Sequence, residues 1–213
     1  RAGATAANDL ARRGRRVLLL DRAGRIKPCG GAIPPRAIKD FDIPDHLLVA
    51  KARSARMIAP SDTKVDIPIE GGFVGMVDRE EFDEWLRERA SSAGAIRRNG
   101  KFERVGADTD GMSTITFVDG DSEQRCTVRA RSIIGADGAR SAVAQQTVPG
   151  AEKTRYVFAY HEIVKAPANK PADYDGSRCD VFYQGHLSPD FYGWVFPHGD
   201  TLSIGTGSAD KGF

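Results

Sequence analysis

A carboxylate at the end of an apolar run, with a glycine upstream of it, is the first feature of the chain that points to chemistry. Asp21 follows Val17–Leu20, a short apolar run typical of a buried parallel strand, and Gly3 lies in the small-residue segment before it. In dinucleotide-binding folds a glycine at this place lets a helix pack closely on the sheet, and the acidic residue accepts hydrogen bonds from ribose hydroxyls. Taken alone, the pattern is equally typical of α/β folds that bind no nucleotide.

The segment Gly135–Ser141 (G-A-D-G-A-R-S) offers a second carboxylate between glycines. The glycines allow the main chain to approach a ligand, and Asp137 can accept hydroxyl hydrogens. A strand-to-helix turn with Asp137 as N-cap explains the same residues without a ligand. This segment alone leaves both interpretations open, and in either case we expect Ser132–Ile134 to be a buried strand before the turn.

The loop Lys27–Pro34 (K-P-C-G-G-A-I-P) places a thiol and two glycines between prolines. The prolines stiffen its ends and the glycines open its middle, so a planar ring could lie against the main chain of Gly30 and Gly31. Cys29 is a nucleophile or proton donor by type, but a lone cysteine is more often a small buried residue.

Aromatic side chains alternate in Pro189–Pro197 (P-D-F-Y-G-W-V-F-P), seven residues before Gly205-Thr206-Gly207. Strand alternation places Tyr192, Trp194 and Phe196 on one face. Such a wall could line an apolar pocket, and its π-faces could stabilise a developing positive charge. An ordinary half-buried strand has the same spacing.

These segments need elements to position them, and the sequence predicts a helix over residues 2–13 that ends at Gly14. A second helix begins after Asp78, where Glu81 completes a capping-box pattern, and ends at Gly94. We expect it to bury Phe82, Trp85, Leu86, Ala90 and Ala93. The predicted strands are a hairpin over 56–69 around residues 60–62, a strand over 73–77, two or three strands between 96 and 128, and antiparallel strands over 156–164, 180–184, 191–196 and 201–205.

Composition narrows the class of protein. The 213 residues are 40% hydrophobic and 28% charged, which is typical of a folded globular chain, and no apolar run is long enough to cross a membrane. Lys plus Arg at 31 against Asp plus Glu at 29 gives a net charge of +2, which argues against nucleic-acid binding. Three distant cysteines support neither a disulfide framework nor a metal site, and they favour a reducing cytoplasm.

The order of these motifs resembles that of FAD enzymes of the para-hydroxybenzoate hydroxylase superfamily, with Arg79 of V-D-R-E-E-F-D as a further shared position. The string P-x-x-Y-x-W-x-F-P-x7-G-x-G resembles the geranylgeranyl reductase family. K-P-C-G-G-A-I-P, G-F-V-G-M-V-D-R-E-E-F-D and Y-V-F-A-Y-H-E-I look most like the geranylgeranyl diphosphate and geranylgeranyl-bacteriochlorophyll reductases of photosynthetic bacteria. The likeness runs the length of the chain.

The resemblance implies an α/β fold (α+β overall), with a Rossmann-like FAD-binding domain and an antiparallel β-sheet substrate domain. It assigns residues 1–54 and 74–150 to the first domain, and the hairpin 55–73 and residues 151–213 to the second. It also implies a fragment: the first strand and two glycines of the fingerprint would precede Arg1, where the family usually has Pro, and a closing G-D-A-A-G segment would follow Phe213. We therefore expect this fragment alone to bind FAD poorly.

The resemblance further implies roles for individual residues. Gly3 packs the helix near the FAD pyrophosphate, Asp21 holds the ribose, and Arg79 reaches the phosphates or ribityl. Cys29 is the candidate catalytic acid. The implied cofactor-binding set is Gly3, Asp21, Arg22, Gly30, Gly31, Arg79, Asp137 and Gly138, and the implied substrate-binding set is Tyr192, Trp194, Phe196 and Pro197.

The implied activity is reduction of a geranylgeranyl chain to phytyl with FAD and NADPH, in chlorophyll or bacteriochlorophyll biosynthesis. The substrate is left open between the free diphosphate and the pigment ester, and the oligomeric state is open too. The implied location is the cytoplasm, with peripheral association with the photosynthetic membrane as an open alternative. Two rival functions remain at this point: a flavin-dependent aromatic monooxygenase and a non-redox, escort-type prenyl-binding protein.

Overall fold

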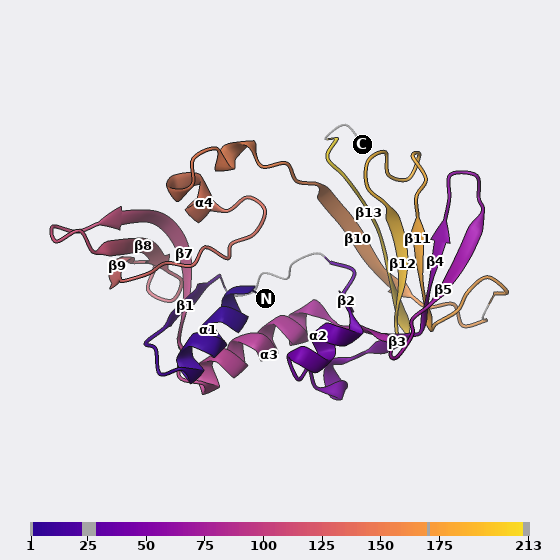
Figure 1. Ribbon diagram of the computed structural model, residues 1–213, viewed down its shortest axis with the longest axis horizontal. Helices are drawn as coiled ribbons and strands as arrows, with labels where there is room; N and C mark the ends of the chain where they lie inside the picture. Colours follow the sequence, from indigo (N-terminus) through magenta and orange to yellow (C-terminus); the bar gives the residue numbers. More distant parts are fainter. Residues whose placement is uncertain (1, 23–28, 170, 211–213) are drawn as a thin grey trace. The chain divides into compact units, whose positions relative to one another are not determined.

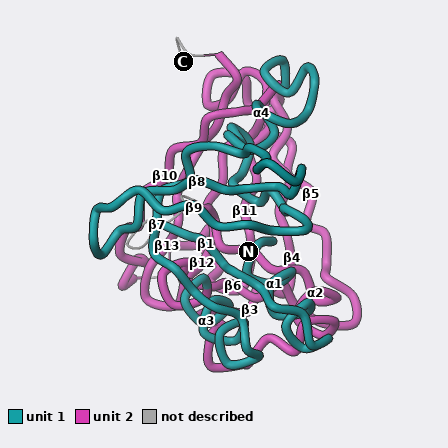
Figure 2. Tube along the Cα trace, turned by 90° about the vertical axis from the view of Figure 1, so that its left-hand side faces the viewer, with its two compact units in different colours: residues 1–25, 83–154 teal, residues 26–82, 155–213 magenta. Residues whose placement is uncertain are grey.

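A computed structural model describes residues 2–22, 29–169 and 171–210. The chain forms two compact units, each built from two separate stretches of sequence (Figure 2). The first unit contains residues 1–25 and 83–154, and the second contains residues 26–82 and 155–213. The expected domain division assigned residues 26–54, 74–82 and 151–154 differently. It stays a prediction, because compactness alone does not define which residues bind a ligand.

The first unit begins with helix α1 (Ala2–Arg12), which buries one narrow stripe of mostly small side chains. Gly14 has a φ of 73°, and the amide of Arg15 donates to the carbonyl of Leu10 at 3.1 Å. This left-handed turn ends the helix, as glycine allows at low cost. The predicted helix and its glycine stop are confirmed. The buried residues recur at helical spacing: Ala4, Ala7, Asn8 and Ala11.

A four-stranded sheet forms the rest of the first unit, in the order β1-β7-β8-β9. Strand β1 (Leu18–Asp21) pairs in parallel with β7 (Ile96–Ala107), and β8 (Ser113–Asp119) and β9 (Arg125–Ala130) follow in antiparallel pairing. The short parallel strand that ends in a carboxylate is confirmed, and so are the strands expected between residues 96 and 128. Helix α4 (Ala142–Thr147) and the 3-10 turn η2 (Ala151–Lys153) complete the unit.

The buried strand predicted for residues 132–134 is wrong. This segment has no strand geometry, and Ile134 is 61% exposed. A buried strand needs neighbours that pair with its main chain and cover its side chains. Among the described residues this segment joins no strand ladder, so its apolar composition alone does not make it a strand.

Helix α3 (Arg79–Ser92) has its first residues in the second unit and the rest in the first. Only some of the residues that we expected it to bury are buried. Phe82, Leu86 and Ala90 are buried as expected. Trp85 is half-buried, with the Arg89 guanidinium 4.6 Å from its ring centroid, and Ala93 is half-buried beyond the helix end. Gly94, with a φ of 103°, ends the helix as predicted.

The second unit is built on a six-stranded sheet in the order β10-β13-β12-β11-β4-β5 (Figure 1). The predicted hairpin is confirmed as β4–β5, and the four later strands are confirmed with antiparallel pairing among themselves. The parallel pairing of β4 with β11 was not expected. The bounds are β4 Ser54–Ile58, β5 Lys64–Pro68, β10 Phe158–Lys165, β11 Arg178–Phe182, β12 Gly193–His198 and β13 Thr201–Ser208.

A smaller sheet, β2-β6-β3, carries the glycine loop and the start of α3 at its ends. It consists of β2 (Ala32–Ile33), β6 (Val74–Met76) and β3 (Ala50–Ala52), with α2 (Pro35–Asp40) and the 3-10 turn η1 (Asp45–Leu47) between them. Among the described residues, no helix is long and apolar enough to span a bilayer. The core of the second unit joins this sheet to β11 through Ala52, Met76 and Cys179.

Candidate active site

Gly3 lies where helix α1 packs closely against the turn that carries Asp137. A Cβ atom placed on Gly3 would lie 3.3 Å from the Cβ of Ala136 and 4.0 Å from Cδ1 of Leu19. The helix is therefore in contact with both the strand that ends at Asp21 and the turn that carries Asp137. The structure brings these predicted cofactor positions together within one unit.

Asp21 stands at the end of β1 and is held by a side chain of α3. The Nε of Arg87 donates to Asp21 Oδ2, and its Nη1 lies 3.2 Å from Glu84 Oε2. The Asp21 side chain is 38% exposed, so the ion pair fixes its orientation without burying it. The predicted neighbour Arg22 is exposed, directly after the strand.

The Asp137 carboxylate binds the first amides of helix α4, whose N-cap residue is Ser141. Asp137 Oδ2 accepts hydrogen bonds from the amides of Ala142 (2.7 Å) and Val143 (3.2 Å), and its Oδ1 accepts from Ser141 Oγ. Partial burial alone would raise the pKa of Asp137, but the bonds from Ser141 and the amides hold this pKa below its usual value. Gly138 takes a φ of 95° in the same turn. The prediction of Asp137 as N-cap is wrong in its residue, because the N-cap is Ser141, whose Oγ accepts from the Ala144 amide at 2.9 Å. Contact of Asp137 with a ligand stays a prediction.

Arg79 is the first residue of α3 and is 8% exposed. It belongs to the second unit, whereas Asp21 and Asp137 belong to the first. The structure thus unites two of the three predicted charged positions in one unit. A common groove for all three stays a prediction.

The glycine pair lies directly against strand β12. A Cβ atom on Gly30 would lie 2.7 Å from Cδ2 of Phe196 and 3.2 Å from Nε1 of Trp194. Gly31 has a φ of 76°, and a Cβ atom there would lie 2.5 Å from the carbonyl oxygen of Val77. Lys27 and Pro28 of the predicted loop lie outside the described residues. Because protein atoms fill the β12 side, a planar ring could meet this main chain only from another side.

The aromatic wall predicted along β12 is present. The ring centroids of Tyr192 and Trp194 are 6.0 Å apart, and those of Trp194 and Phe196 are 6.2 Å apart. Cys29 is half-buried, and burial, Tyr183 and Cys29 together raise the pKa of Tyr192. Strand alternation turns Pro197, which is fully buried, toward the other face.

The later glycine of the aromatic motif has a packing role that the sequence analysis missed. Gly205 is the cross-strand partner of Trp194, and a Cβ atom on Gly205 would lie 2.2 Å from Cζ2 of the indole. The indole therefore lies flat over the main chain of β13. The spacing between the tryptophan and the glycine was the signal for this contact.

Polar side chains behind the aromatic wall were also missed. Trp194 Nε1 donates to Ser203 Oγ at 3.2 Å, and Ser203 Oγ lies 3.1 Å from His161 Nδ1. Ser203 has no exposed surface, and His198 beside it is buried as well. Burial, followed by the charge of His198, lowers the pKa of His161. Period-two alternation along residues 158–165 and 201–208 could have placed these groups on the face of Trp194.

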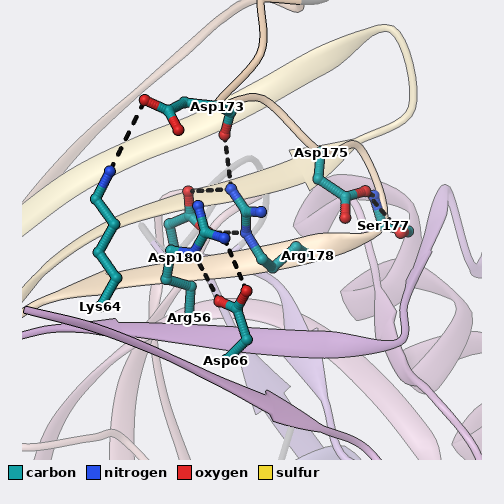
Figure 3. Close-up of polar contacts among 8 residues, drawn as sticks. All are labelled: Arg56, Lys64, Asp66, Asp173, Asp175, Ser177, Arg178 and Asp180. Atoms are coloured by element: carbon teal, nitrogen blue, oxygen red, sulfur yellow. Dashed lines mark hydrogen bonds and ion pairs between the residues drawn. The ribbon is translucent and has the colours of Figure 1, made fainter.

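The opposite face of the same sheet holds an apolar cavity of about 450 Å³. Glu162, Ile204 and Val195 are successive cross-strand partners on this face and line the cavity. Farther along, paired arginines and aspartates cover the face (Figure 3). Among the described residues, no group of three His, Cys, Asp or Glu side chains is placed to hold a metal ion.

Residues 1–186 match the profile of the FAD binding domain family, and the chain belongs to this family. It is 62% identical over 207 residues to a geranylgeranyl diphosphate reductase of Rhodobacter capsulatus, covering 97% of this chain and 52% of that protein. A chloroplastic geranylgeranyl diphosphate reductase of Oryza sativa subsp. japonica is 40% identical over 222 residues, covering 97% and 47%.

The fold matches a solved geranylgeranyl bacteriochlorophyll reductase-like protein from Thermoplasma acidophilum, with a TM-score of 0.80 and 22% identity, covering 97% of this chain and 53% of that one. The chain spans about half the length of the curated relatives it matches.

Proposed function

We propose that this protein reduces a geranylgeranyl chain to phytyl, with FAD as bound cofactor and NADPH as reductant. The substrate is a geranylgeranyl diphosphate or a geranylgeranyl ester of a chlorophyll-type pigment. The observation that carries the proposal is the 62% identity to a geranylgeranyl diphosphate reductase over 97% of the chain. Identity at this level over nearly the whole chain supports a shared activity.

The residues of the first unit fit an FAD molecule. The close approach at Gly3 leaves no room for a Cβ without displacement of Ala136, as expected where a helix packs tightly beside a pyrophosphate. Asp21, with Arg22 next to it, would hold the adenosine ribose. Asp137 has oxygen lone pairs beyond its bonds to the start of α4, and with Gly138 it would contact the ribityl chain.

The second unit would supply the remaining contacts. Arg79 would offset the negative charge of the phosphates, and its rigid guanidinium suits that role. Gly30 and Gly31 would approach the isoalloxazine with main chain alone. Reduced by NADPH, the cofactor would supply the hydride that no side chain can provide.

The aromatic wall would exclude water from the reacting alkene. An isolated trisubstituted alkene accepts hydride poorly, so a proton must reach one carbon as hydride reaches the other. Tyr192, Trp194 and Phe196 would line an apolar slot for the prenyl chain, whereas Pro197, buried on the other face of β12, would only support the strand. Cys29 would be the proton donor, since it is half-buried beside this wall.

We also propose that the protein works in the cytoplasm at the surface of a photosynthetic membrane, because a prenyl chain partitions into lipid. Co-sedimentation of the complete protein with vesicles that carry a geranylgeranylated pigment tests this part. Recovery in the supernatant with and without the pigment would contradict it.

The decisive experiment is anaerobic incubation of the complete protein with NADPH and a geranylgeranylated pigment or diphosphate. Mass spectrometry should show products heavier by two, four and six hydrogens. Oxygen-dependent NADPH oxidation with a hydroxylated aromatic product would identify a monooxygenase instead. A colourless protein that binds the prenyl chain without taking up FAD would identify a carrier.

A further inference from the structure

His198 makes two side-chain contacts that link distant parts of the second unit. It is the last residue of β12, and its side chain is 3% exposed. Its Nδ1 lies 3.1 Å from Oδ1 of Asp78, just before α3, and its Nε2 lies 3.1 Å from the carbonyl oxygen of Gly30. A Cβ atom on Gly31 would lie 2.8 Å from Cε1 of the same ring. The imidazole therefore fills the space between the glycine pair and the start of α3.

Both atoms that face the imidazole are hydrogen-bond acceptors. A neutral imidazole carries one N–H and can donate to only one of them, whereas an imidazolium ion donates to both. The imidazole is buried, and a ring nitrogen without its proton would face an acceptor oxygen with no donor between them, so the geometry favours the form that donates to both oxygens.

The charges around His198 fit this form. The Asp78 carboxylate is the opposite charge beside it, and the side chain of Asp78 is 54% exposed, so it remains hydrated. His161 on β10 is a second titratable group near it, and the positive charge of His198 helps to lower the pKa of His161. The main chain of His198 is held as well: it pairs with Thr201 on β13, and Thr201 Oγ1 donates to the His198 carbonyl at 3.2 Å.

We propose that His198 is a positioning residue that, as an imidazolium ion, ties the Gly30 carbonyl to Asp78. The glycine pair has no side chains that could anchor it. Its described anchors are the His198 bond and the 3.1 Å bond from the Val77 amide to the Gly31 carbonyl. Fixing the Gly30 peptide plane sets the direction in which the main chain of this loop can meet a ligand. That this ligand is the flavin rests on the proposed function.

The first test is the protonation state of the ring. Nitrogen-15 NMR of the complete protein at neutral pH should show both ring nitrogens of His198 protonated. Asp78→Asn removes the opposite charge and should leave one ring nitrogen unprotonated at the same pH. A neutral His198 ring in the unaltered protein would overturn the proposal.

The second test uses two substitutions that each keep one of the two bonds. The amide nitrogen of His198→Gln reaches the position of Nε2 and can still donate to Gly30, whereas that of His198→Asn reaches only the position of Nδ1. Hydrogen exchange of the Val77 amide, which reports on its bond to Gly31, should stay near the unaltered rate in His198→Gln. It should be about tenfold faster in His198→Asn. Equal rates in the two variants would overturn the proposal.

These measurements need neither substrate nor flavin, so they separate this inference from the proposed function. Prenyl reduction together with equal exchange rates in both variants would reject the positioning role alone. Unequal exchange without prenyl reduction would reject the proposed function alone. In protein that holds FAD, His198→Asn should also shift the visible flavin spectrum, and His198→Gln should preserve it.

Discussion

The two faces of the six-stranded sheet come from the same strands and differ in how they are filled. On one face, Trp194, Phe196 and His198 follow each other along β12 and pack against the glycine pair. On the other face, one row of cross-strand partners contains Asp180, Arg56 and Asp66 (Figure 3). At the glycine pair and at Gly205 the first face leaves no room for an added Cβ atom, and we call it the closed face. The second, the charged face, carries paired arginines and aspartates.

The charged face is held by ion pairs of good geometry. Arg56 makes a two-point contact with Asp66, with Nε–Oδ1 at 2.6 Å and Nη2–Oδ2 at 2.7 Å. Arg178 binds Asp180 in the same way, at 2.6 and 3.2 Å, and also donates to the Asp173 carbonyl at 2.6 Å (Figure 3). The Arg56 bond holds the pKa of Asp66 below its usual value. The Arg56–Asp66 pair is partly exposed, and pairs of that kind contribute little to stability. The difference between the faces teaches that close approach, more than the number of polar contacts, makes a position intolerant to change.

The largest effect should come from Gly205→Ala on the closed face. The added Cβ would lie 2.2 Å from Cζ2 of Trp194, so the indole must move and lose its bond to Ser203. We expect a loss of about 2–3 kcal/mol in the free energy of unfolding, measured by denaturant titration. Gly185→Ala is the matched control, because nothing lies within 4 Å of its Cβ position. Equal stability of the two variants would refute the close packing.

Gly30→Ala should have the next largest effect. Its Cβ would meet the Phe196 ring at 2.7 Å, a smaller overlap than the 2.2 Å between a Gly205 Cβ and the indole. We expect a loss of about 1–2 kcal/mol in the free energy of unfolding. In Gly30→Ala combined with Phe196→Ala, the loss should be less than the sum of the two single losses, because the second change makes room for the first. Strict additivity would show that the two residues do not touch.

Cys179 tests how well the closed face is covered. It is buried in the core cluster, and burial followed by the charge of Asp180 raises the pKa of its thiol to about 12. Only the thiolate is nucleophilic, and at about pH 8 its fraction would be roughly one in ten thousand. Mass spectrometry after brief iodoacetamide treatment of the folded protein should find Cys126, which is half-buried, alkylated before Cys179. The order should vanish in denaturant, and alkylation of Cys179 first in the folded protein would contradict its burial.

The smallest effect should come from the charged face. Arg56→Gln removes the contact with Asp66, yet the carboxylate that loses its partner stays hydrated, since the Asp66 side chain is 52% exposed. The melting temperature should fall only slightly at low salt, and the difference from the unaltered protein should shrink at high salt, which screens exposed charges. A loss comparable to that of Gly205→Ala would remove the contrast between the two faces.

The sequence predicted those elements whose determinants are local. Helix α1, its stop at Gly14 and the hairpin β4–β5 follow from spacing within a few residues. The face shared by Trp194 and Phe196 follows from strand alternation in the same way.

What the sequence could not supply depends on partners far along the chain. Residues 132–134 are as apolar as a strand but have no strand to pair with among the described residues. The contacts of His198 with Gly30 and Asp78 join segments that no local pattern relates. The roles of Asp21, Arg79 and Asp137 toward a cofactor remain predictions. The place of a residue in the fold shows which ligands its side chain could reach, but not which ligand it binds.

The parallel pairing of β4 with β11 has a consequence for how the protein is made. Ser54 is in register with Arg178, so most of the chain must be synthesised before β4 can pair with β11. Until then, the hairpin β4–β5 is an isolated ribbon, which is marginally stable in water, and Val65 and Ile67 on β5 are exposed even in the finished fold. Closing so long a loop slows folding. We therefore expect nascent chains that stop short of β11 to be recognised by chaperones at this hairpin.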